Sequence, residues 1–302
     1  MHLRTQMLRT LGISLLAFVV VMLIVLFPRK IDLTLEGNLI VATYDASMEQ
    51  FVANIKQFFV DVFQNQSLGY SRFSGESAGE AVIRAMGKSL AVIGAALVIG
   101  FVFGILKGIA DYKLSKTRFN ILGHWTTWIF QSMPDFFVLL ILQWFIIDHL
   151  PFIRFFAPDG WQSFALLSVL VSLYPIVYIA SLTSASLAAQ EGKLYLLFAK
   201  AKGLSNRIIL FKHMLRNSMG TLLTQLPTLL VYILSNLLMV EIFRNYPGAA
   251  WRLYTAMDYN TYQGTGQDFE AGIIIGITFC IMLLILLVQW ISHVAKKYFD
   301  PI

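Results

Sequence analysis

Charged residues are scarce in this chain. Asp, Glu, Lys and Arg make up 13% of its 302 residues, whereas a soluble domain carries about 25%. Hydrophobic residues make up 57%, and the mean hydropathy is +0.69. This composition excludes a soluble globular domain and indicates helices that cross a bilayer. The net charge of +6 does not indicate nucleic-acid binding, because no basic patch lies on a soluble face.

Several motifs of enzymes and cofactor proteins are also missing. The single cysteine, Cys280, excludes an intrachain disulfide and a cysteine-based zinc site. The five histidines are scattered and form no HExxH motif, and no GxSxG motif or intramembrane aspartate pair supports a hydrolase. Without GxxxxGK[ST] the chain cannot cradle nucleotide phosphates in the usual way. We therefore expect no enzyme and no cofactor on this chain, with any ATP and Mg²⁺ held by a partner.

Long apolar runs dominate the rest of the sequence. A membrane helix needs about 20 mostly apolar residues. Six stretches meet this requirement, at residues 11–27, 89–110, 125–147, 163–188, 220–243 and 271–294. The predicted fold is an all-α integral membrane protein with six transmembrane helices.

The distribution of Lys and Arg predicts the orientation, because these residues concentrate in cytoplasmic loops. With a cytoplasmic N-terminus, the loops on that side hold 14 of the 23 Lys and Arg residues, in shorter segments than the other nine. Both termini are then cytoplasmic in a multi-pass protein. The predicted segments are a cytoplasmic N-terminus at 1–10, a first transmembrane helix at 11–27, an extracytoplasmic segment at 28–88, a transmembrane domain of five helices at 89–294 that includes a cytoplasmic hairpin at 190–218, and a cytoplasmic C-terminus at 295–302.

The extracytoplasmic segment contains one amphipathic run, "MEQFVANIKQFFVDVFQ". Phe51, Ile55, Phe58 or Phe59, and Val62 recur in it at helical spacing. We expect a small helical segment on the outer surface after the first span.

The cytoplasmic segment at 190–218 is basic and amphipathic. Leu194, Leu197, Phe198 and Ala201 stand at i, i+3, i+4 and i+7, which places them on one helix face. Gly203 is placed to end this helix in the left-handed conformation.

A second helix is predicted to follow, with Ser205 or Asn206 as its N-cap. Ile208, Phe211 and Leu215 would line one of its faces. Two readings of the hairpin stay open: it seats in a groove of another protein, or it lies on the inner leaflet with its lysines against anionic lipid.

Short sequences along the chain resemble one transporter family. "AKAKGLS" (199–205) and "HMLRN" (213–217) resemble the coupling motif of permease subunits of binding-protein-dependent (type I) ABC importers. The likeness is greatest to the peptide/nickel branch of oligopeptide and dipeptide permease B-like proteins, in which "ARAKGLS…HALRN" is typical. "SLGYS" (67–71) resembles "DLGxS", "VEIFRNYPG" (240–248) resembles "VETVFSWPG", and "FDP" (299–301) resembles "LDP". The resemblance covers nearly the whole chain.

The sequence departs from this family at four points. Leu197, Phe198 and Ala199 stand where the broader importer motif has Glu-Ala-Ala, and Arg216 stands where a proline is common. "FPRKID" replaces "PGDP" after the first span, and the "PV" that usually follows "DLGxS" is missing. These departures indicate a divergent member.

The resemblance implies a pore-forming subunit of an importer for peptides or similar small solutes, in the cell membrane of a prokaryote. Its partners would be two ABC ATPase subunits, a second permease subunit of different sequence, an extracytoplasmic substrate-binding protein and membrane lipids, but no nucleic acid. In this family the hairpin seats in a cleft of the ATPase and tilts the spans as the ATPase pair closes. The implied coupling residues are Leu194, Leu197, Phe198, Ala199, Ala201, Lys202, Gly203, Leu204, Ser205, Leu215 and Asn217.

Some residues inside the spans can be assigned to packing or to a pathway. Gly100, Gly104 and Gly108 lie four apart and form a small-residue face for close helix packing. Polar residues are costly in lipid unless they are paired or face water. Candidates for lining the pathway, with hydrogen bonding between helices or contact with headgroup water as the alternative, are Gln131, Asp135, Gln225 and Asn236.

A second function stays open beside transport. Because the proline and the "PGDP" element are missing, the alternative remains a membrane scaffold or sensor with a divergent permease fold, which relays the state of an ATPase or ligand without transport.

Overall fold

The computed structural model describes residues 3–29, 31–36, 39–44, 47–69, 71–73, 75–117, 120–157, 160–257 and 269–299. For residues 3, 31–36, 39–44, 120–124, 131 and 135 it describes the backbone alone. Two compact units make up the chain. The first comprises Met1–Leu90 and Pro247–Leu286, and the second comprises Ala91–Tyr246 and Leu287–Ile302.

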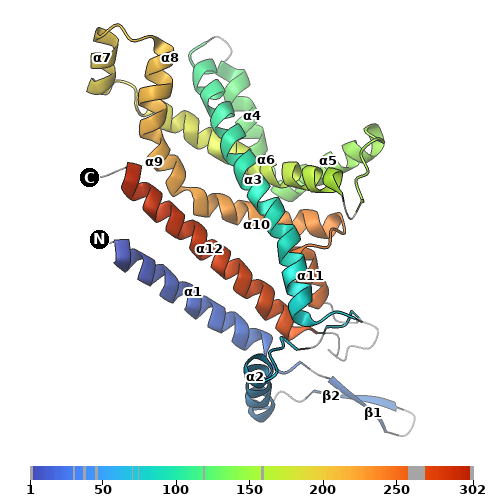
Figure 1. The fold of residues 1–302 in the computed structure, drawn as a ribbon. Coiled ribbons are helices and arrows are strands. Elements are labelled where there is room, and N and C mark those ends of the chain that lie inside the picture. Colours follow the sequence, from blue (N-terminus) through green and yellow to red (C-terminus); the bar gives the residue numbers. More distant parts are fainter. Residues whose placement is uncertain are drawn as a thin grey trace. The chain divides into compact units, whose positions relative to one another are not determined.

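Helices account for most of the described residues (Figure 1). Five of them are long and apolar enough to cross a membrane: α1, α3, α6, α10 and α12. The helices are α1 (Leu3–Val25), α2 (Met48–Phe63), α3 (Ala78–Leu114), α4 (Asn120–Ser132), α5 (Asp135–His149), α6 (Trp161–Ala188), α7 (Leu194–Ala201), α8 (Asn206–Ile208), the π-helix η1 (Ile209–Leu215), α9 (Arg216–Thr224), α10 (Leu226–Phe243), α11 (Ala249–Ala256) and α12 (Ala271–Phe299).

The first unit has an apolar core built from the end of α1, the N-terminal turns of α3 and α12, and α11. Ala81 and Val82 of α3 and Ile273 and Ile277 of α12 are buried in this core. Phe51, Ile55 and Phe58 of α2 pack against it, whereas Phe59 is 39% exposed. Of the two phenylalanines that the pattern left open, Phe58 therefore belongs to the packed face.

The segment after the first span is not purely helical, which corrects the prediction of an all-α chain. Strands β1 (Ile31–Glu36) and β2 (Leu39–Tyr44) pair antiparallel, with Ile31 opposite Tyr44 and Glu36 opposite Leu39. The run "IDLTLE" alternates apolar and polar residues, which suits a strand and not a helix. Helix α2 follows, and the Ser47 hydroxyl caps it by accepting a 3.2 Å hydrogen bond from the Gln50 N–H.

In the second unit, three glycines let α3 approach α6 closely. A methyl group at Gly100 would lie 2.8 Å from Cβ of Pro175, and one at Gly104 would lie 2.6 Å from Cβ of Ile179. At Gly108 a methyl group would lie 2.5 Å from Cβ of Thr183. Side chains at these positions would push the two helices apart, as expected for small residues at a membrane helix interface.

The third predicted span, at 125–147, is wrong as a single helix. Helix α4 ends at Ser132 and α5 begins at Asp135, with Pro134 at its N-cap. Proline donates no backbone N–H and restricts the residue before it, so the helical ladder stops at this point. A similar break at Gln225, followed by Pro227, separates α9 from α10, so the apolar helix begins at Leu226 and not at residue 220.

Candidate functional site

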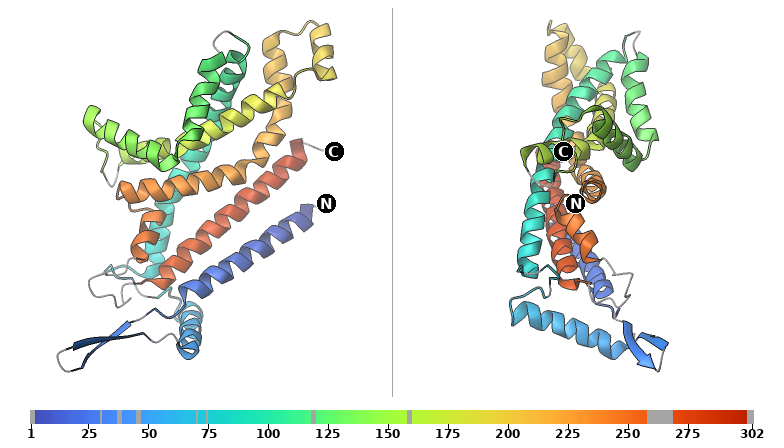
Figure 2. Two further views of the ribbon diagram at one scale, coloured as in Figure 1. Left: turned by 180° about the vertical axis from the view of Figure 1, so that it is seen from behind. Right: turned by 90° about the vertical axis from the view of Figure 1, so that its right-hand side faces the viewer.

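The segment after α6 folds into a hairpin whose first arm is α7 (Figures 1 and 2). Gly203, at φ +75°, ends this arm. The Gly203 N–H donates to the Lys200 carbonyl (2.9 Å), and the Leu204 N–H donates to the Ala199 carbonyl (3.3 Å). This is the Schellman arrangement, in which a left-handed residue closes the last turn of a helix. The backbone of the turn is thus satisfied within the hairpin.

The second arm is a continuous helical run from α8 through η1 into α9. Of the two predicted caps, Ser205 is the N-cap, and its carbonyl accepts from the Ile209 N–H at 3.0 Å, although its side chain forms no capping hydrogen bond. The π-helical part, Ile209–Leu215, uses i→i+5 hydrogen bonds, so its faces differ from those of an α-helix.

The inner side of the hairpin is fixed to the ends of α3 and α6. Leu196 and Ala199 of α7 are 6% and 5% exposed, and they belong to a cluster of buried residues drawn from both arms and from both long helices. The cluster comprises Ile109, Tyr112, Leu187, Leu196, Ala199, Ile209, Leu210 and Met214, with Leu204 and Leu215 packed against it. Because both arms share this core with α3 and α6, the hairpin and these helix ends form one packed body.

The outer side of α7 presents apolar side chains that the described part of the chain does not cover. Leu194, Leu197 and Phe198 are 72%, 53% and 68% exposed, and Ala201 is exposed beside them. Leu197 also contributes to the lining of the pocket between the hairpin and α3. We call these four residues the outer stripe. Each has a short or apolar side chain, so the stripe gains little from contact with water and offers a surface for burial against a partner.

The second arm does not follow the predicted pattern. Ile208 and Phe211 are exposed, at 44% and 51%, but Leu215 is half-buried in the inner cluster. The three therefore differ in burial, and Leu215, in the π-helical part of the arm, packs against the inner cluster while Ile208 and Phe211 stay exposed.

The remaining predicted hairpin residues divide between the two sides. Ala199, Leu204 and Leu215 contribute to the inner cluster. Lys202, Gly203 and Ser205 are exposed at the turn. Asn217 is exposed on α9 and lines a hollow of about 480 Å³ together with Lys212, His213, Arg216, Tyr298 and Phe299.

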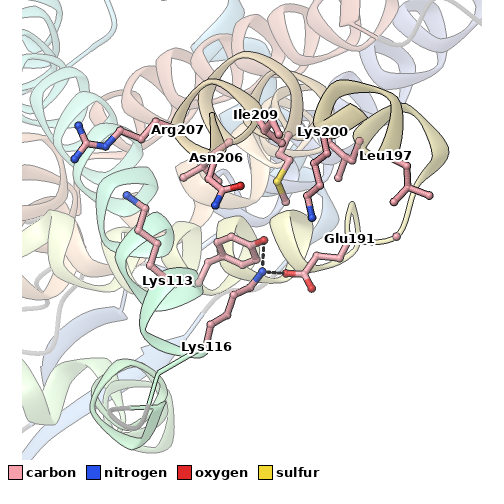
Figure 3. A pocket seen from close by; sticks show the side chains of 13 residues that line it. Lys113, Lys116, Glu191, Leu197, Lys200, Asn206, Arg207 and Ile209 are labelled. Carbon is pink, nitrogen blue, oxygen red and sulfur yellow. Dashed lines mark hydrogen bonds and ion pairs between the residues drawn. The ribbon is translucent and has the colours of Figure 1, made fainter. Parts of the chain in front are cut away.

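A pocket of about 480 Å³ lies between the hairpin and the end of α3 (Figure 3). At its edge the Lys116 ammonium forms an ion pair with Glu191 and donates a 2.8 Å hydrogen bond to the Tyr112 hydroxyl. Hydrogen bonding from Lys116, with a smaller part from Tyr112, holds the pKa of the Glu191 carboxyl below its ordinary value. The sequence reasoning missed this pair because its members are 75 residues apart and belong to different elements.

The four predicted pathway residues differ in what the structure says of them. The side chains of Gln131 and Asp135 lie outside the described residues. Gln225 accepts hydrogen bonds through Oε1 from the hydroxyls of Tyr178 (2.8 Å) and Thr228 (3.2 Å). Asn236 is 2% exposed, and its Oδ1 finds no hydrogen-bond partner among the described residues. In this conformation Asn236 is buried within the bundle and does not line an open surface.

A buried ion pair in the first unit was also missed. The Arg252 guanidinium donates from Nη1 and Nη2 to Oε2 and Oε1 of Glu270 at 2.6 and 2.7 Å, and the Arg72 backbone N–H donates to Oε1 at 2.8 Å. Arg252 and Glu270 are 2% and 0% exposed. Burial favours the neutral acid, but the hydrogen bonds from Arg252 and Arg72 outweigh it, and the pKa of Glu270 lies below its ordinary value. The pair ties α11 to the start of α12.

The described residues contain no group of three His, Cys, Asp or Glu side chains suited to hold a metal ion. The geometry instead offers a fixed hairpin with an apolar outer stripe, close-packed membrane helices and a basic pocket.

Comparisons with known proteins agree with this description. Residues 96–297 match the family described as "binding-protein-dependent transport system inner membrane component". The chain is 20% identical over 234 residues to a dipeptide transport system permease protein of Alkalihalophilus pseudofirmus, covering 68% of each chain. It is 26% identical over 215 residues to the same kind of protein from Bacillus subtilis, covering 68% of this chain and 63% of the relative.

A third relative extends the range of solutes named for such proteins. It is a glutathione transport system permease protein of Salmonella paratyphi A, 27% identical over 167 residues, with 55% of this chain and 54% of the relative aligned. The matches thus span between about half and two thirds of the relatives' own length. Since the family match covers most of the chain, this protein belongs to the inner-membrane permease components of binding-protein-dependent ABC transport systems, and it is a transporter subunit and not an enzyme.

Proposed function

We propose that this chain forms one half of the transmembrane pathway of an ATP-driven importer for peptides or similar small solutes. Two ATPase subunits, a second permease subunit and an extracytoplasmic binding protein complete the assembly. The hairpin lies in the cytoplasm and transmits the closure of the ATPase pair to the membrane helices. The solute class rests on the dipeptide and glutathione systems to which the relatives belong.

The outer stripe is the observation that carries this proposal. Leu194, Leu197 and Phe198 leave large apolar side chains exposed on a helix that is too short to cross a membrane. The exposed Lys200 and Lys202 lie between and beside them, so the arm is poorly suited to lie in hydrocarbon. A groove of an ATPase subunit would bury the stripe while leaving the lysines in water.

The inner cluster supports the transmission of force. Leu196 and Ala199 of α7 share one packed core with Ile109 of α3 and Leu187 of α6. Protein interiors are close-packed and do not deform freely. A displacement of α7 should therefore move the ends of α3 and α6 with it, and the glycine contacts between those two helices keep them together.

The test replaces Leu197 and Phe198 by Asp in the complex reconstituted with its ATPase. Two charges on the outer stripe should abolish ATPase binding, and solute accumulation in vesicles should fall at least about tenfold, since one buried unpaired charge already costs more than about 1.4 kcal/mol. The midpoint of thermal unfolding of the isolated chain should stay unchanged, because both side chains are exposed.

Two matched variants make the result specific. Phe63→Asp alters a side chain that is 75% exposed on α2 and should leave ATPase binding intact. Leu196→Asp alters the inward neighbour and should lower the unfolding midpoint. ATPase binding that survives the double Asp variant would contradict the proposed docking surface.

One further measurement separates transport from the sensor alternative. A transporter should accumulate solute in vesicles when ATP and the binding protein are supplied. Solute-dependent ATPase activity without accumulation would favour a sensor that keeps the permease fold.

A further inference from the structure

The pocket between α3 and the hairpin carries an excess of positive charge. Its lining includes Lys113 and Lys116 from the end of α3, Lys200 from α7 and Arg207 from α8. Among the described residues, Glu191 is the one carboxylate that lines it. In Figure 3 the ammonium groups of Lys113, Lys116 and Lys200 and the amide of Asn206 reach into the space from different elements. The three lysines thus come from two different elements and do not simply share one solvated helix face, whereas the Arg207 guanidinium points away from them in Figure 3.

Three of the four cations remain available for a ligand. The charged ends of Lys113, Lys200 and Arg207 form no hydrogen bond or ion pair with any described residue. Lys113 lies over the Phe211 ring, 5.8 Å from its centroid, a contact that leaves the ammonium protons free to donate. Several like charges around one hollow repel each other unless an anion lies among them.

The single carboxylate does not neutralise the group. Glu191 is already engaged with Lys116, and its single negative charge is shared with Lys200, which also attracts it. Three positive charges therefore remain over a volume of about 480 Å³, which is ample for a phosphate group and its ester substituents.

The position of the pocket places it beyond the hydrocarbon. Helix α3 has 37 residues and is about 55 Å long, whereas the hydrocarbon core is about 30 Å thick. Its last turn carries Lys113, and Lys116 follows the helix. Such a segment reaches the level of lipid headgroups and water, where phosphate groups are abundant.

We propose that this pocket binds a phosphate-bearing anion, held by charge-assisted hydrogen bonds from Lys113 and Lys200 and by the amide of Asn206. The anion is either the headgroup of an acidic phospholipid or a soluble phosphate compound. Both present a negatively charged phosphate group that accepts hydrogen bonds from the lysines. A bound phosphate bridges the end of α3 and both arms of the hairpin. It therefore stiffens the joint between them, independently of whether the hairpin docks on an ATPase.

The test measures binding to the full-length chain in a neutral detergent. The probes are inorganic phosphate, short-chain phosphatidylglycerol and, as an uncharged-headgroup control, short-chain phosphatidylcholine. We expect at least one of the first two probes to bind, and the Lys113→Gln/Lys200→Gln variant to weaken that binding about tenfold or more, since hydrogen bonds to charged groups contribute about 1.5–3 kcal/mol each.

Glu191→Gln provides a gain-of-affinity variant. It removes the carboxylate found among the described lining residues and releases Lys116, so affinity should rise severalfold, which an unfolded protein could not show. Lys193→Gln removes an exposed hairpin charge that does not line the pocket and should change the affinity less than about twofold, as expected for a charge that solvent and salt screen.

The probes also distinguish the two sources. Pocket-dependent binding of phosphatidylglycerol alone identifies a lipid headgroup, and pocket-dependent binding of inorganic phosphate identifies a soluble anion. The proposal is overturned if neither probe binds, or if Lys113→Gln/Lys200→Gln and Lys193→Gln have the same effect. Because binding is measured on the isolated chain, its failure leaves the proposed transport function untouched.

Discussion

Two ion pairs, one in each unit, show how differently the chain uses charge. Arg252 and Glu270 are almost completely buried, and both oxygens of the carboxylate are occupied by hydrogen bonds from Arg252 and Arg72. Lys116 and Glu191 are 52% and 46% exposed, and unpaired cations surround them. The first pair is complete within its unit and serves the fold. The second pair lines a pocket of about 480 Å³ that is large enough to hold an anionic ligand.

The largest effect is expected from breaking the buried pair. Arg252→Met leaves the Glu270 carboxylate buried without its partner, which should lower the free energy of unfolding by about 3–5 kcal/mol. The unfolding midpoint of the detergent-solubilised chain, followed by circular dichroism, measures this change. Replacing both residues, as Arg252→Met with Glu270→Leu, should recover most of the loss because no buried charge remains.

A surface pair of the same unit serves as the control. Arg84 donates to Glu76 at 2.6 Å, but its side chain is 61% exposed. Arg84→Gln should cost less than about 1 kcal/mol. If Arg252→Met were no more harmful than Arg84→Gln, the buried pair would not hold α11 and α12 together.

An intermediate effect is expected at the hairpin turn. Its backbone N–H groups are hydrogen-bonded within the hairpin, but its side chains are exposed. Gly203→Val forces a β-branched residue to φ +75°, and the left-handed conformation costs about 1–2 kcal/mol for a residue with a Cβ. We expect the complex to assemble but transport, measured as solute accumulation, to fall because the angle of α7 changes.

Asn tolerates the left-handed region better than other non-glycine residues. Gly203→Asn should therefore recover a substantial part of the activity. Equal activity of the Val variant and the unmodified protein would show that the turn geometry is not required.

The smallest effect is expected from the exposed pair. Lys116→Gln should cost less than about 1 kcal/mol at neutral pH, and less still in 1 M salt, because solvent screens both partners. The folded-state pKa of Glu191 is lowered, so its stabilisation is present above the unfolded-state pKa of about 4.3 and is lost as the pH falls through the folded-state value.

The unfolding midpoints of Lys116→Gln and the unmodified chain should therefore converge in acid. The comparison at pH 7 and pH 3 in low salt measures this. A difference that persists at pH 3 would show that Lys116 acts through Tyr112 or through packing and not through the Glu191 carboxylate.

Features that depend on residues close together in the sequence, such as the end of a helix or one of its faces, were predictable. Gly203 marks the end of α7 because no other residue type enters the left-handed region so easily, and the spacing of Leu194, Leu197 and Phe198 places them on one side of a short helix. The glycines of α3 likewise signal close packing by their spacing alone.

Features that depend on tertiary context were not predictable in this way. Hydropathy sums over a window and does not register that Pro134 interrupts the third span. The π-helical turns of η1 have no signal in the apolar pattern, and neither does the packing of Leu215 against the inner cluster. Arg252 and Glu270 meet only because α11 and α12 pack together, so their 18-residue separation carries no signal.

The break between α4 and α5, at Met133 and Pro134, limits how these two helices can contact lipid. Helix α5 has 15 residues and spans about 22 Å, so neither it nor α4 crosses a bilayer unaided. Peptide groups released at such a break cannot be satisfied by hydrocarbon, and each one left bare costs several kcal/mol. We expect this side of the bundle to be shielded from acyl chains, either by a neighbouring polypeptide or by a water-filled passage.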